Sequence, residues 1–429
     1  MIPLSHLLDL MPAKLLDRLA TALHVNKVNQ IKLSGQTVFL CLLNSLVNNP
    51  IVSQRILEAT FLKVTGHTVD HSSFGKRLAV INPDYFEAIY THIYRAIQPQ
   101  MAVSDERALR LRRVDATTVV LSAKVLGFGI HVNSGGKIGK GHAKRHVKSV
   151  FTLSGEGLPE FLHLCTTQSE ANDNPALGDP MIDATRPGEL WIVDKGLFDR
   201  DRLLTIHQRG GFFLVPHKDQ ALHVLGIVWE ASPAQLAEWT AAPPPACQGA
   251  RGGKGRGPAP CRLLRVERAV FQNSVDAKSP TKQEKWAQLP LLVLYCQCWD
   301  ERKQCWKLLV LLTNLVLSAD GTQAGPYTLA EVAELYRLRW DIETFFKFLK
   351  QHLSFSHLTS HDENGIRVMI WMALIAALLL IWYKRATGRK DYWNVIKFWF
   401  AEEVRAWTQV QLAADLARTW RSAGVQASG

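Results

Sequence analysis

Apolar positions over the first hundred residues recur every three or four places, which is the period of an amphipathic helix. The stretches 35–49, 53–66 and 83–98 show this pattern most clearly. Polar residues fill the positions between them, as expected where one face of each helix is buried and the other is wet. We therefore predict that residues 1–105 form a helical N-terminal domain.

The period changes at about residue 106 to the short Val- and Thr-rich runs that are typical of strands. Strands and helices then follow in the order three strands, helix, strand, helix, strand. This order predicts an α/β fold with a mixed five-stranded sheet over residues 106–216. The strand-like stretches are 111–123, 146–167 (two strands joined by a turn), 188–196 and 211–218, and the helical stretches are 174–184 and 198–211.

Residues 217–325 break the alternation of strands and helices. They hold four strand-like stretches, at 221–231, 261–271, 289–300 and 305–317. Between the first two, residues 243–260 contain five prolines and five glycines, a composition that favours a loop over a helix or strand. We interpret the region as a mostly β insertion within the α/β core.

The helical period returns at Thr328, which forms a capping-box pattern with Glu331 and so predicts a helix that runs to about His352. Residues 326–385 would complete the core, and their last helix has no charged side chain from 368 to 383. That run is shorter than the roughly 20 residues of a comfortable membrane span, so we predict a buried helix. The segment 386–429 is Trp-rich and amphipathic, and we consider it a helical tail with a role in dimerisation.

Charge narrows the class of partner. The 429 residues include 50 Lys and Arg against 38 Asp and Glu, a formal net charge of +12. Such an excess favours nucleic acid or an acidic membrane face as partner, although a basic surface can also serve solubility alone. The seven cysteines lack paired zinc spacing, and no signal peptide is visible. We therefore expect a cytoplasmic protein with reduced thiols and no membrane partner.

One predicted helix carries polar residues close to its apolar side. At about 100° per residue, Tyr336, Arg339, Glu343 and Lys350 fall within one sector of about 60°, beside the apolar face. Charges at such an edge are costly unless they are paired or have a function. An Arg339–Glu343 ion pair with Lys350 reaching to water is the structural alternative.

Two further carboxylates belong to the predicted sheet. Asp115 lies in its first strand, and Asp194 directly follows its fourth strand. Either one alone could be a helix cap or a surface acid. Together with Glu343 they would supply the oxygen ligands that a hard divalent cation prefers.

The pattern Tyr-x2-Arg-x3-Glu-x6-Lys at 336–350 resembles the signature of the IS-four group of bacterial insertion-sequence DDE transposases. The blocks around Asp115 and Asp194 are similar to those of the same group, and the resemblance covers residues 106–385. It implies an RNase H-like core with Asp115, Asp194 and Glu343 as catalytic, metal-binding acids. It further implies that the protein uses two Mg²⁺ or Mn²⁺ ions to cleave DNA and transfer its strands. The partner would be double-stranded DNA, both the element ends and the target, and the protein would bind it as a homodimer. Such a protein would associate with the nucleoid when bound to DNA.

Residues that contact DNA are expected around this site, in the helical N-terminal domain 1–105 and in a basic zone. Residues 101–150 hold ten Lys or Arg and three acids, a net charge of +7, in a Gly-rich context that suits a phosphate backbone. One of three tryptophans in the insertion, at 286, 299 and 306, could stack on an unpaired base, although core packing is the simpler expectation for each. The predicted DNA contacts are Tyr336, Arg339, Lys350, Lys137, Lys140, Lys144, Arg145, Lys148 and Lys218.

Two other functions remain open at this point. One is an RNase H-like, metal-dependent DNA nuclease that cuts without strand transfer. The other is a DNA-binding derivative without catalysis, which the intact Asp115, Asp194 and Glu343 argue against.

Overall fold

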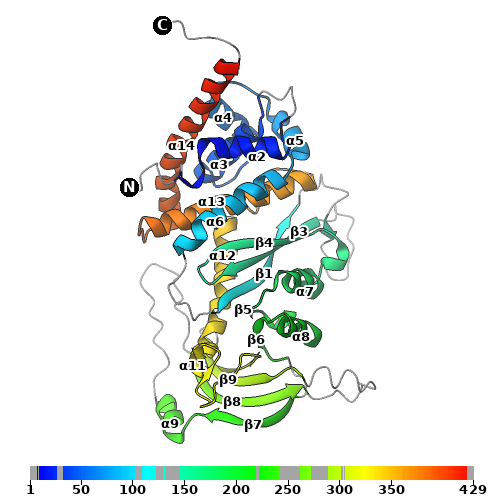
Figure 1. Cartoon of the computed structure of the whole chain (residues 1–429), viewed down its shortest axis with the longest axis vertical. Helices are drawn as coiled ribbons and strands as arrows, with labels where there is room; N and C mark the ends of the chain where they lie inside the picture. Colours follow the sequence, from blue (N-terminus) through cyan, green and yellow to red (C-terminus); the bar gives the residue numbers. More distant parts are fainter. Residues whose placement is uncertain are drawn as a thin grey trace.

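The computed structural model shows an elongated molecule with helices at one end and strands at the other (Figure 1). Within it, α2 and α14 lie at the helical end, and β7, β8 and α9 lie at the opposite end. The structure describes residues 7, 9–26, 32–101, 109–121, 129–131, 145–218, 222–241, 261–271, 288–300, 303, 305–360 and 362–422.

The predicted helical N-terminal region is present. Ser34 and Ser53 cap the second and third of its helices, accepting hydrogen bonds from Thr37 N and Ile56 N. The second helix is buried along nearly its whole length, which explains its uniformly apolar sequence. Among the described residues, its helices are α2 (Ala13–Ala22), α3 (Gly35–Asn48), α4 (Gln54–Thr65), α5 (His71–Val80) and α6 (Asp84–Met101).

The centre of the molecule is a mixed sheet whose five core strands have the order β4-β3-β1-β5-β6. Strand β3 runs antiparallel to both of its neighbours, β4 and β1, and β5 and β6 run parallel to β1. This arrangement confirms the predicted RNase H-like α/β core. The strands are β1 (Arg110–Val120), β3 (Arg145–Ser154), β4 (Pro159–Cys165), β5 (Glu189–Ile192) and β6 (Phe212–Pro216), with the short β2 (Ile130–His131) beside β3.

Alternating residues of the sheet face two different layers. Val150 packs in the cluster that contains α7 (Asp173–Ala184) and α8 (Arg200–Gln208). Phe151, the next residue, packs instead with the phenylalanines of α12 (Trp340–His352) on the other face. Helices on both faces therefore enclose the strands that carry the predicted acids.

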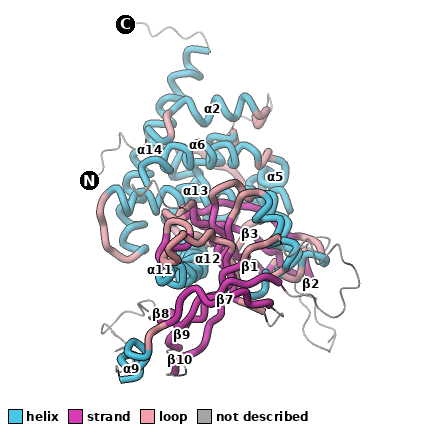
Figure 2. Tube along the Cα trace, turned by 60° about the horizontal axis from the view of Figure 1, so that its bottom comes forward, coloured by secondary structure: helices cyan, strands magenta, loops and turns pink. Residues whose placement is uncertain are grey.

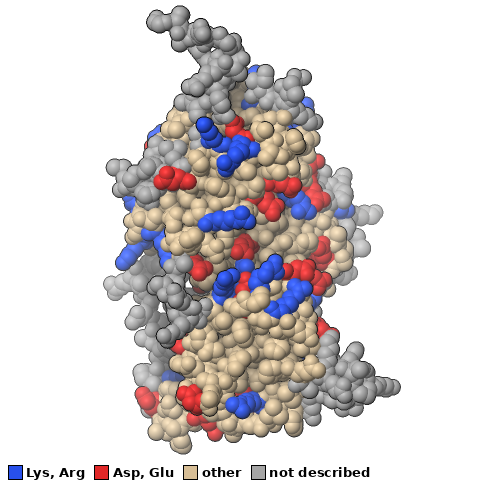
Figure 3. Space-filling model, viewed as in Figure 1, with Lys and Arg blue, Asp and Glu red and all other residues tan. Residues whose placement is uncertain are grey.

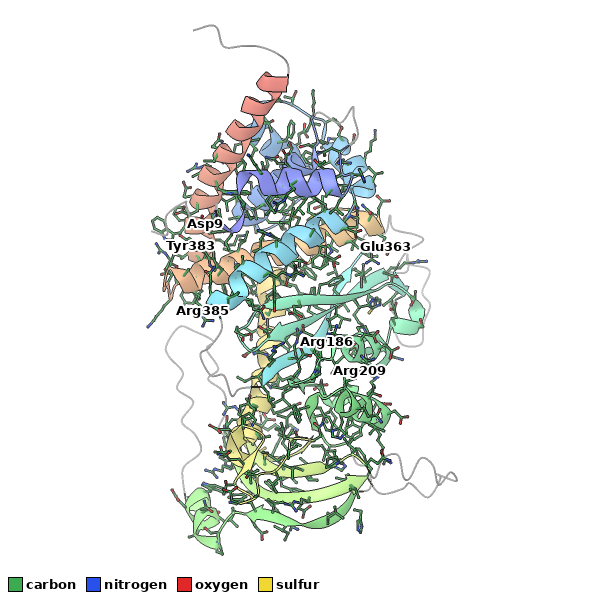
Figure 4. The ribbon with its side chains drawn as sticks, in the orientation of Figure 1. Asp9, Arg186, Arg209, Glu363, Tyr383 and Arg385 are labelled. Atoms are coloured by element: carbon green, nitrogen blue, oxygen red, sulfur yellow. The ribbon has the colours of Figure 1, made fainter. Side chains whose placement is uncertain are left out.

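The end of α7 is held by two arginines from the connections that follow α7 and α8 (Figure 4). Arg186 Nη1 donates to Asp183 O at 2.8 Å, and Arg209 Nη1 donates to Ile182 O. Cationic side chains at the C-terminus of a helix donate hydrogen bonds to its free carbonyls and interact favourably with the negative end of its dipole. On this face, Lys and Arg side chains alternate with acidic ones across the level of α7 and α8, and charge is sparse over the strands at the far end (Figure 3).

The insertion extends the same sheet instead of forming a separate one. Its strand β10 (Cys305–Thr313) pairs antiparallel with β6 through Leu312 and Val215, which gives ten strands in all. The physical reason is that β6 would otherwise end the core with an unpaired edge. Figure 2 shows these strands projecting away from the helices. The other elements are β7 (Leu222–Glu230), α9 (Pro233–Ala241), β8 (Cys261–Phe271) and β9 (Leu291–Asp300).

The strands of the insertion match the sequence prediction, but α9 was not anticipated. The predicted loop at 243–260 lies outside the described residues.

The helix predicted from Thr328 to His352 is interrupted. The capping box is present, and α11 spans Leu329–Leu335. Tyr336–Arg339 then form one 3₁₀ turn before α12 begins. Because a 3₁₀ turn has about three residues per turn, the uniform 100° count across Arg339 was wrong. A short β11–β12 hairpin (Gln323–Ala324 and Tyr327–Thr328) precedes α11.

The long apolar helix α13 (Glu363–Ala386) is buried, as predicted. It is long and apolar enough to cross a membrane, but 89% of its most apolar window is buried inside the protein. Glu363 and Arg385 mark its two ends in Figure 4.

The last helix, α14 (Trp393–Ser422), packs back onto the N-terminal helices. Trp407 Nε1 donates to Met11 O at 3.1 Å, and Asn44 Nδ2 donates to Thr408 Oγ1 at 2.8 Å. Both ends of the chain therefore share one hydrophobic core with α12, α13 and one face of the sheet.

Candidate functional site

Two of the predicted acids follow a pair of neighbouring strands. Strand β1 pairs parallel with β5 so that Arg113 lies beside Ile192. Asp115 and Asp194 each follow a member of this pair by two residues. Asp115 is partly buried in mid-strand, whereas Asp194 is exposed just past the end of β5 and accepts a hydrogen bond from Gly196 N.

The third acid comes from the first turn of α12, which is fastened to the same strand. Arg113 is buried, and its Nη1 donates to Asp341 Oδ2 at 2.6 Å. That ion pair links β1 to the start of α12, two residues before Glu343. This contact brings the start of α12, and with it Glu343, next to the strand that carries Asp115.

Arg339 lies between the carboxylates. Its Nη2 is 3.0 Å from Glu343 Oε1, and its Nε is 3.8 Å from Asp194 Oδ1. The Arg339–Glu343 ion pair considered from the sequence is thus present, but the guanidinium is buried and its Nε has no hydrogen-bond partner. The exposed ring of Trp340 packs against it, 5.0 Å from ring centre to Cζ.

Burial is the main influence on the ionisation of Asp115. Burial raises the pKa of Asp115 to about 6, with further raising by Glu343 and Asp173, while the Ala116 amide and Arg339 oppose the shift. Burial alone would lower the pKa of Arg339, but Tyr336 and the three acids outweigh it and raise that pKa. A cation is therefore favoured at this position.

The donor set suits a hard divalent metal because all three predicted ligands offer carboxylate oxygen. Among the described residues, the cluster of three potential ligands whose atoms all lie within 4.8 Å of one another is a different one, at His163. At least two of the three acids are therefore farther apart than that, and Arg339 contacts Asp194 and Glu343.

A depression of about 610 Å³ opens next to Glu343. Lys350, two turns further along α12, lines it together with Thr117 of β1 and Lys148 of β3. Burial lowers the pKa of Lys350, which is half-buried there. The structure thus brings Glu343 and Lys350 to one hollow, as their spacing on the helix implies.

Lys148 does not present a free charge to this hollow. It is buried, and its Nζ donates to Ala171 O at 2.6 Å and to Asp173 Oδ1 at 2.8 Å. Its predicted contact with DNA phosphate stays a prediction: these two oxygens engage two of the three N–H donors of the ammonium group, and Lys148 lines the depression. Its function here is to hold Asp173, which lines the same depression.

The other predicted contacts divide into described and undescribed residues. Arg145 is partly exposed at the start of β3, Lys218 is exposed after β6, and Tyr336 is partly buried with a pKa raised to about 12, chiefly by burial. Lys137, Lys140 and Lys144 lie outside the described residues, as does Trp286.

Of the remaining tryptophans in the insertion, Trp299 is buried. It packs edge-on against Trp306, and the guanidinium of Arg262 stacks over the Trp306 ring.

Sequence reasoning missed Asp173 and the Arg113–Asp341 pair. Asp173 stands at the start of a helix, where an acid is expected for capping alone. Only its pairing with Lys148, which depends on the fold, brings it to the site. Arg113 is one of two adjacent arginines in β1, and nothing in the sequence distinguishes the buried one.

Together, the strand order and the three acids on β1, after β5 and on α12 define a protein of the RNase H-like class. Residues 108–379 match the family described as "Transposase DDE domain". The match covers more than half of the chain, which therefore belongs to that family. The IS-four group in particular stays a prediction.

Short stretches are similar to curated relatives. The chain is 37% identical over 70 residues to a putative transposase for insertion sequence element IS4SA of Synechocystis sp., covering 16% of this chain and 20% of that protein. It is 31% identical over 91 residues to a probable transposase for insertion sequence element IS5377 of Geobacillus stearothermophilus, covering 21% and 22%. The matches thus span about a fifth of the relatives' length.

Among solved structures, a cryo-EM structure of the piggyBac transposase synaptic complex with hairpin DNA aligns at 9% identity with a TM-score of 0.40. The alignment covers 93% of this chain and 80% of that one, and it is too weak to carry an argument.

Proposed function

We propose that this protein is a transposase that cuts DNA at the ends of an insertion sequence and transfers the freed strands to target DNA. The observation that supports the proposal is that Arg339 contacts both Asp194 and Glu343, next to the strand that carries Asp115. The family to which residues 108–379 belong supports the same chemistry.

The three acids would hold divalent ions, Mg²⁺ or Mn²⁺ and two in number, at the edge of the sheet. When bound, such ions activate an attacking oxygen and stabilise the leaving oxygen of a phosphodiester. The raised pKa of Asp115 supports this role, because a buried carboxylate beside other acids gains most from a cation. Water would attack first and free a 3′-OH, which would then attack target DNA.

Arg339 would exchange partners during this process. A guanidinium clamps phosphate with two parallel hydrogen bonds, and the Nε of Arg339 is a buried donor without a partner. A DNA phosphate that enters beside Glu343 would take over from the carboxylates as its acceptor. The metal site and a phosphate contact would thus be assembled by one side-chain movement.

DNA would follow the depression from Glu343 towards Lys350. Lys350 is half-buried there and lies about 10 Å along the helix from Glu343, which suits a flanking phosphate. Tyr336, Arg145 and Lys218 are further proposed contacts, and two copies of the chain would act together on DNA.

A cleavage assay tests the activity. The full-length protein is incubated with Mg²⁺ and duplex DNA that carries the inverted repeats flanking its gene. Asp115→Asn, Asp194→Asn and Glu343→Gln should each abolish cutting. Asp199→Asn is the matched control: Asp199 lies five residues after Asp194 and caps α8, and Asn caps a helix equally well.

The products separate the alternatives. Joined strands in the wild-type reaction support transposition, whereas cleavage without joining supports an RNase H-like nuclease. Cleavage that persists unchanged in all three acid variants would refute the assigned site.

A further inference from the structure

A second cluster of metal-ligating side chains lies where β4 leaves the sheet. His163 and Cys165 are two residues apart in β4 and so project from the same face of the strand. Glu170 follows in a short 3₁₀ turn, Gln168–Glu170. One ligand atom from each of the three residues lies within 4.8 Å of the other two.

The two oxygens of Glu170 have separate roles. Oε2 accepts hydrogen bonds from Thr166 N at 3.1 Å, Thr167 N at 3.1 Å and Thr167 Oγ1 at 2.7 Å, which close the turn. Oε1 has one partner, His163 Nε2 at 2.5 Å. A cation that replaced the shared proton between Oε1 and the imidazole would therefore leave the capping hydrogen bonds intact.

Burial and charge around the cluster are also suitable. Cys165 is fully buried, whereas the side chain of His163 is 40% exposed, so the cluster has a buried floor and an open side. Although burial opposes it, hydrogen bonds from Thr167 and His163 lower the pKa of Glu170 to about 2, which keeps the carboxylate ionised. Cys165 carries a proton in the ion-free protein, because burial raises its pKa to about 12.

We propose that His163, Cys165 and Glu170 form a binding site for a divalent transition-metal ion of the Zn²⁺ type. Imidazole nitrogen, thiolate and carboxylate oxygen are the ligands that Zn²⁺ takes, and three protein ligands leave a fourth position for water. The sulfur ligand separates this site from the three-acid site, whose oxygen donors suit Mg²⁺ or Mn²⁺. Binding releases the Cys165 proton to solvent and requires an unprotonated Nε2 on His163.

The ion would brace one wall of the DNA-cleaving site. Cys165 lies opposite Lys148 in the sheet, and Lys148 holds both Ala171 O and Asp173 Oδ1. Asp173 lines the depression beside Glu343. A metal ion bound by His163, Cys165 and Glu170 would link the segment 166–173 to β4 through Glu170. Lys148 already holds the same segment through Ala171 and Asp173.

The competing explanation is a closed polar cluster. The His163–Glu170 hydrogen bond and the capping hydrogen bonds already satisfy both oxygens of the carboxylate. On that explanation Cys165 is a buried, inert thiol, and no metal binds with a sulfur ligand.

Cobalt titration distinguishes the two explanations without any activity measurement. The full-length protein is stripped with a chelator and titrated with Co²⁺, whose thiolate-to-cobalt charge-transfer band in the near ultraviolet reports a sulfur ligand. We expect one equivalent of this band, displaced by Zn²⁺ but not by Mg²⁺. Cys165→Ser should remove the band, and His163→Gln should weaken binding by more than about tenfold.

Two controls define what would overturn the proposal. Cys305→Ser, which removes an exposed thiol in β10, and Asp115→Asn, which disables the three-acid site, should leave the band unchanged. Absence of the band in the wild type, or its survival in Cys165→Ser, refutes the site. If Cys165→Ser fails to fold, the half-exposed His163→Gln decides: unchanged Co²⁺ affinity in that variant also refutes it.

Discussion

Replacing Asp115 by Asn should abolish DNA cleavage and yet stabilise the metal-free protein at neutral pH. The ionised form of Asp115 is disfavoured by burial and by Glu343 and Asp173. The folded-state pKa of about 6 lies above the ordinary aspartate value of 3.8. At 1.36 kcal/mol per unit, this corresponds to a cost of up to about 3 kcal/mol when the carboxylate is charged.

The sign of the pH dependence follows from proton binding. Between pH 3.8 and about 6 the folded state binds more protons than the unfolded state. Stability therefore falls as pH rises through this window, and the loss is complete above the folded-state pKa. Asn cannot ionise, so Asp115→Asn should match the wild type near pH 4 and exceed it at pH 8.

The assay is denaturant unfolding of wild type and Asp115→Asn in a chelator, at several pH values from 4 to 8. The stability difference should grow to between about 1 and 3 kcal/mol at pH 8, and Asp199→Asn should show no such trend. Added Mn²⁺ should stabilise the wild type and not the variant, because a ligand that binds the folded state adds to its stability. A variant that is less stable than wild type at pH 8, or a difference that does not change with pH, would refute the reasoning.

Three further predictions concern the surroundings of the site. Lys350→Ala should weaken DNA binding and lower the slope of log affinity against log salt by about one, because one phosphate contact is lost. Fluorescence anisotropy measures this slope, and an unchanged slope would exclude the contact. Asp173→Ala should destabilise the protein by about 1–3 kcal/mol, because it leaves the buried ammonium group of Lys148 without its acid. Lys148→Met removes that ammonium group and should destabilise the protein less. Urea unfolding measures both values, and the reverse order would contradict this explanation. Thr328→Ala should cost about 1 kcal/mol in the same measurement through loss of the capping box, and Thr328→Ser, which keeps the cap, should cost little.

The elements were predictable from the sequence wherever one period dominates. The helices of the first hundred residues and the strands β1 and β3 to β10 follow from the spacing of apolar positions, the two-residue β2 was missed, and the capping box at Thr328 marked the start of α11. The continuation of the sheet from β6 into the insertion was not predictable. Strand pairing across a long insertion depends on which edge is left open, and this is a property of the assembled fold.

The sequence was enough to propose the acids of the candidate site, but it did not predict the side chains around them. Asp115 and Asp194 were recognisable because each lies in or directly after an apolar strand. Lys148 and Arg113 were not, because a lysine or arginine in a basic stretch gives no sign that it is buried. The 3₁₀ turn at Tyr336–Arg339 escaped for a similar reason: its residues are good helix formers, and tertiary contacts with β1 and β5 determine its geometry.

The hydrophobic core shared by the N-terminal helices and α14 determines when the protein can fold during synthesis. Helix α3 packs against both α13 and α14, and α13 also covers α6 and β4. A ribosome-bound chain that stops before residue 363 already contains Asp115, Asp194 and Glu343, yet its α3 and one face of its sheet lack their covering layer. Folding of the candidate site should therefore wait for the residues after 363, so that chains truncated there would be unfolded targets for proteolysis.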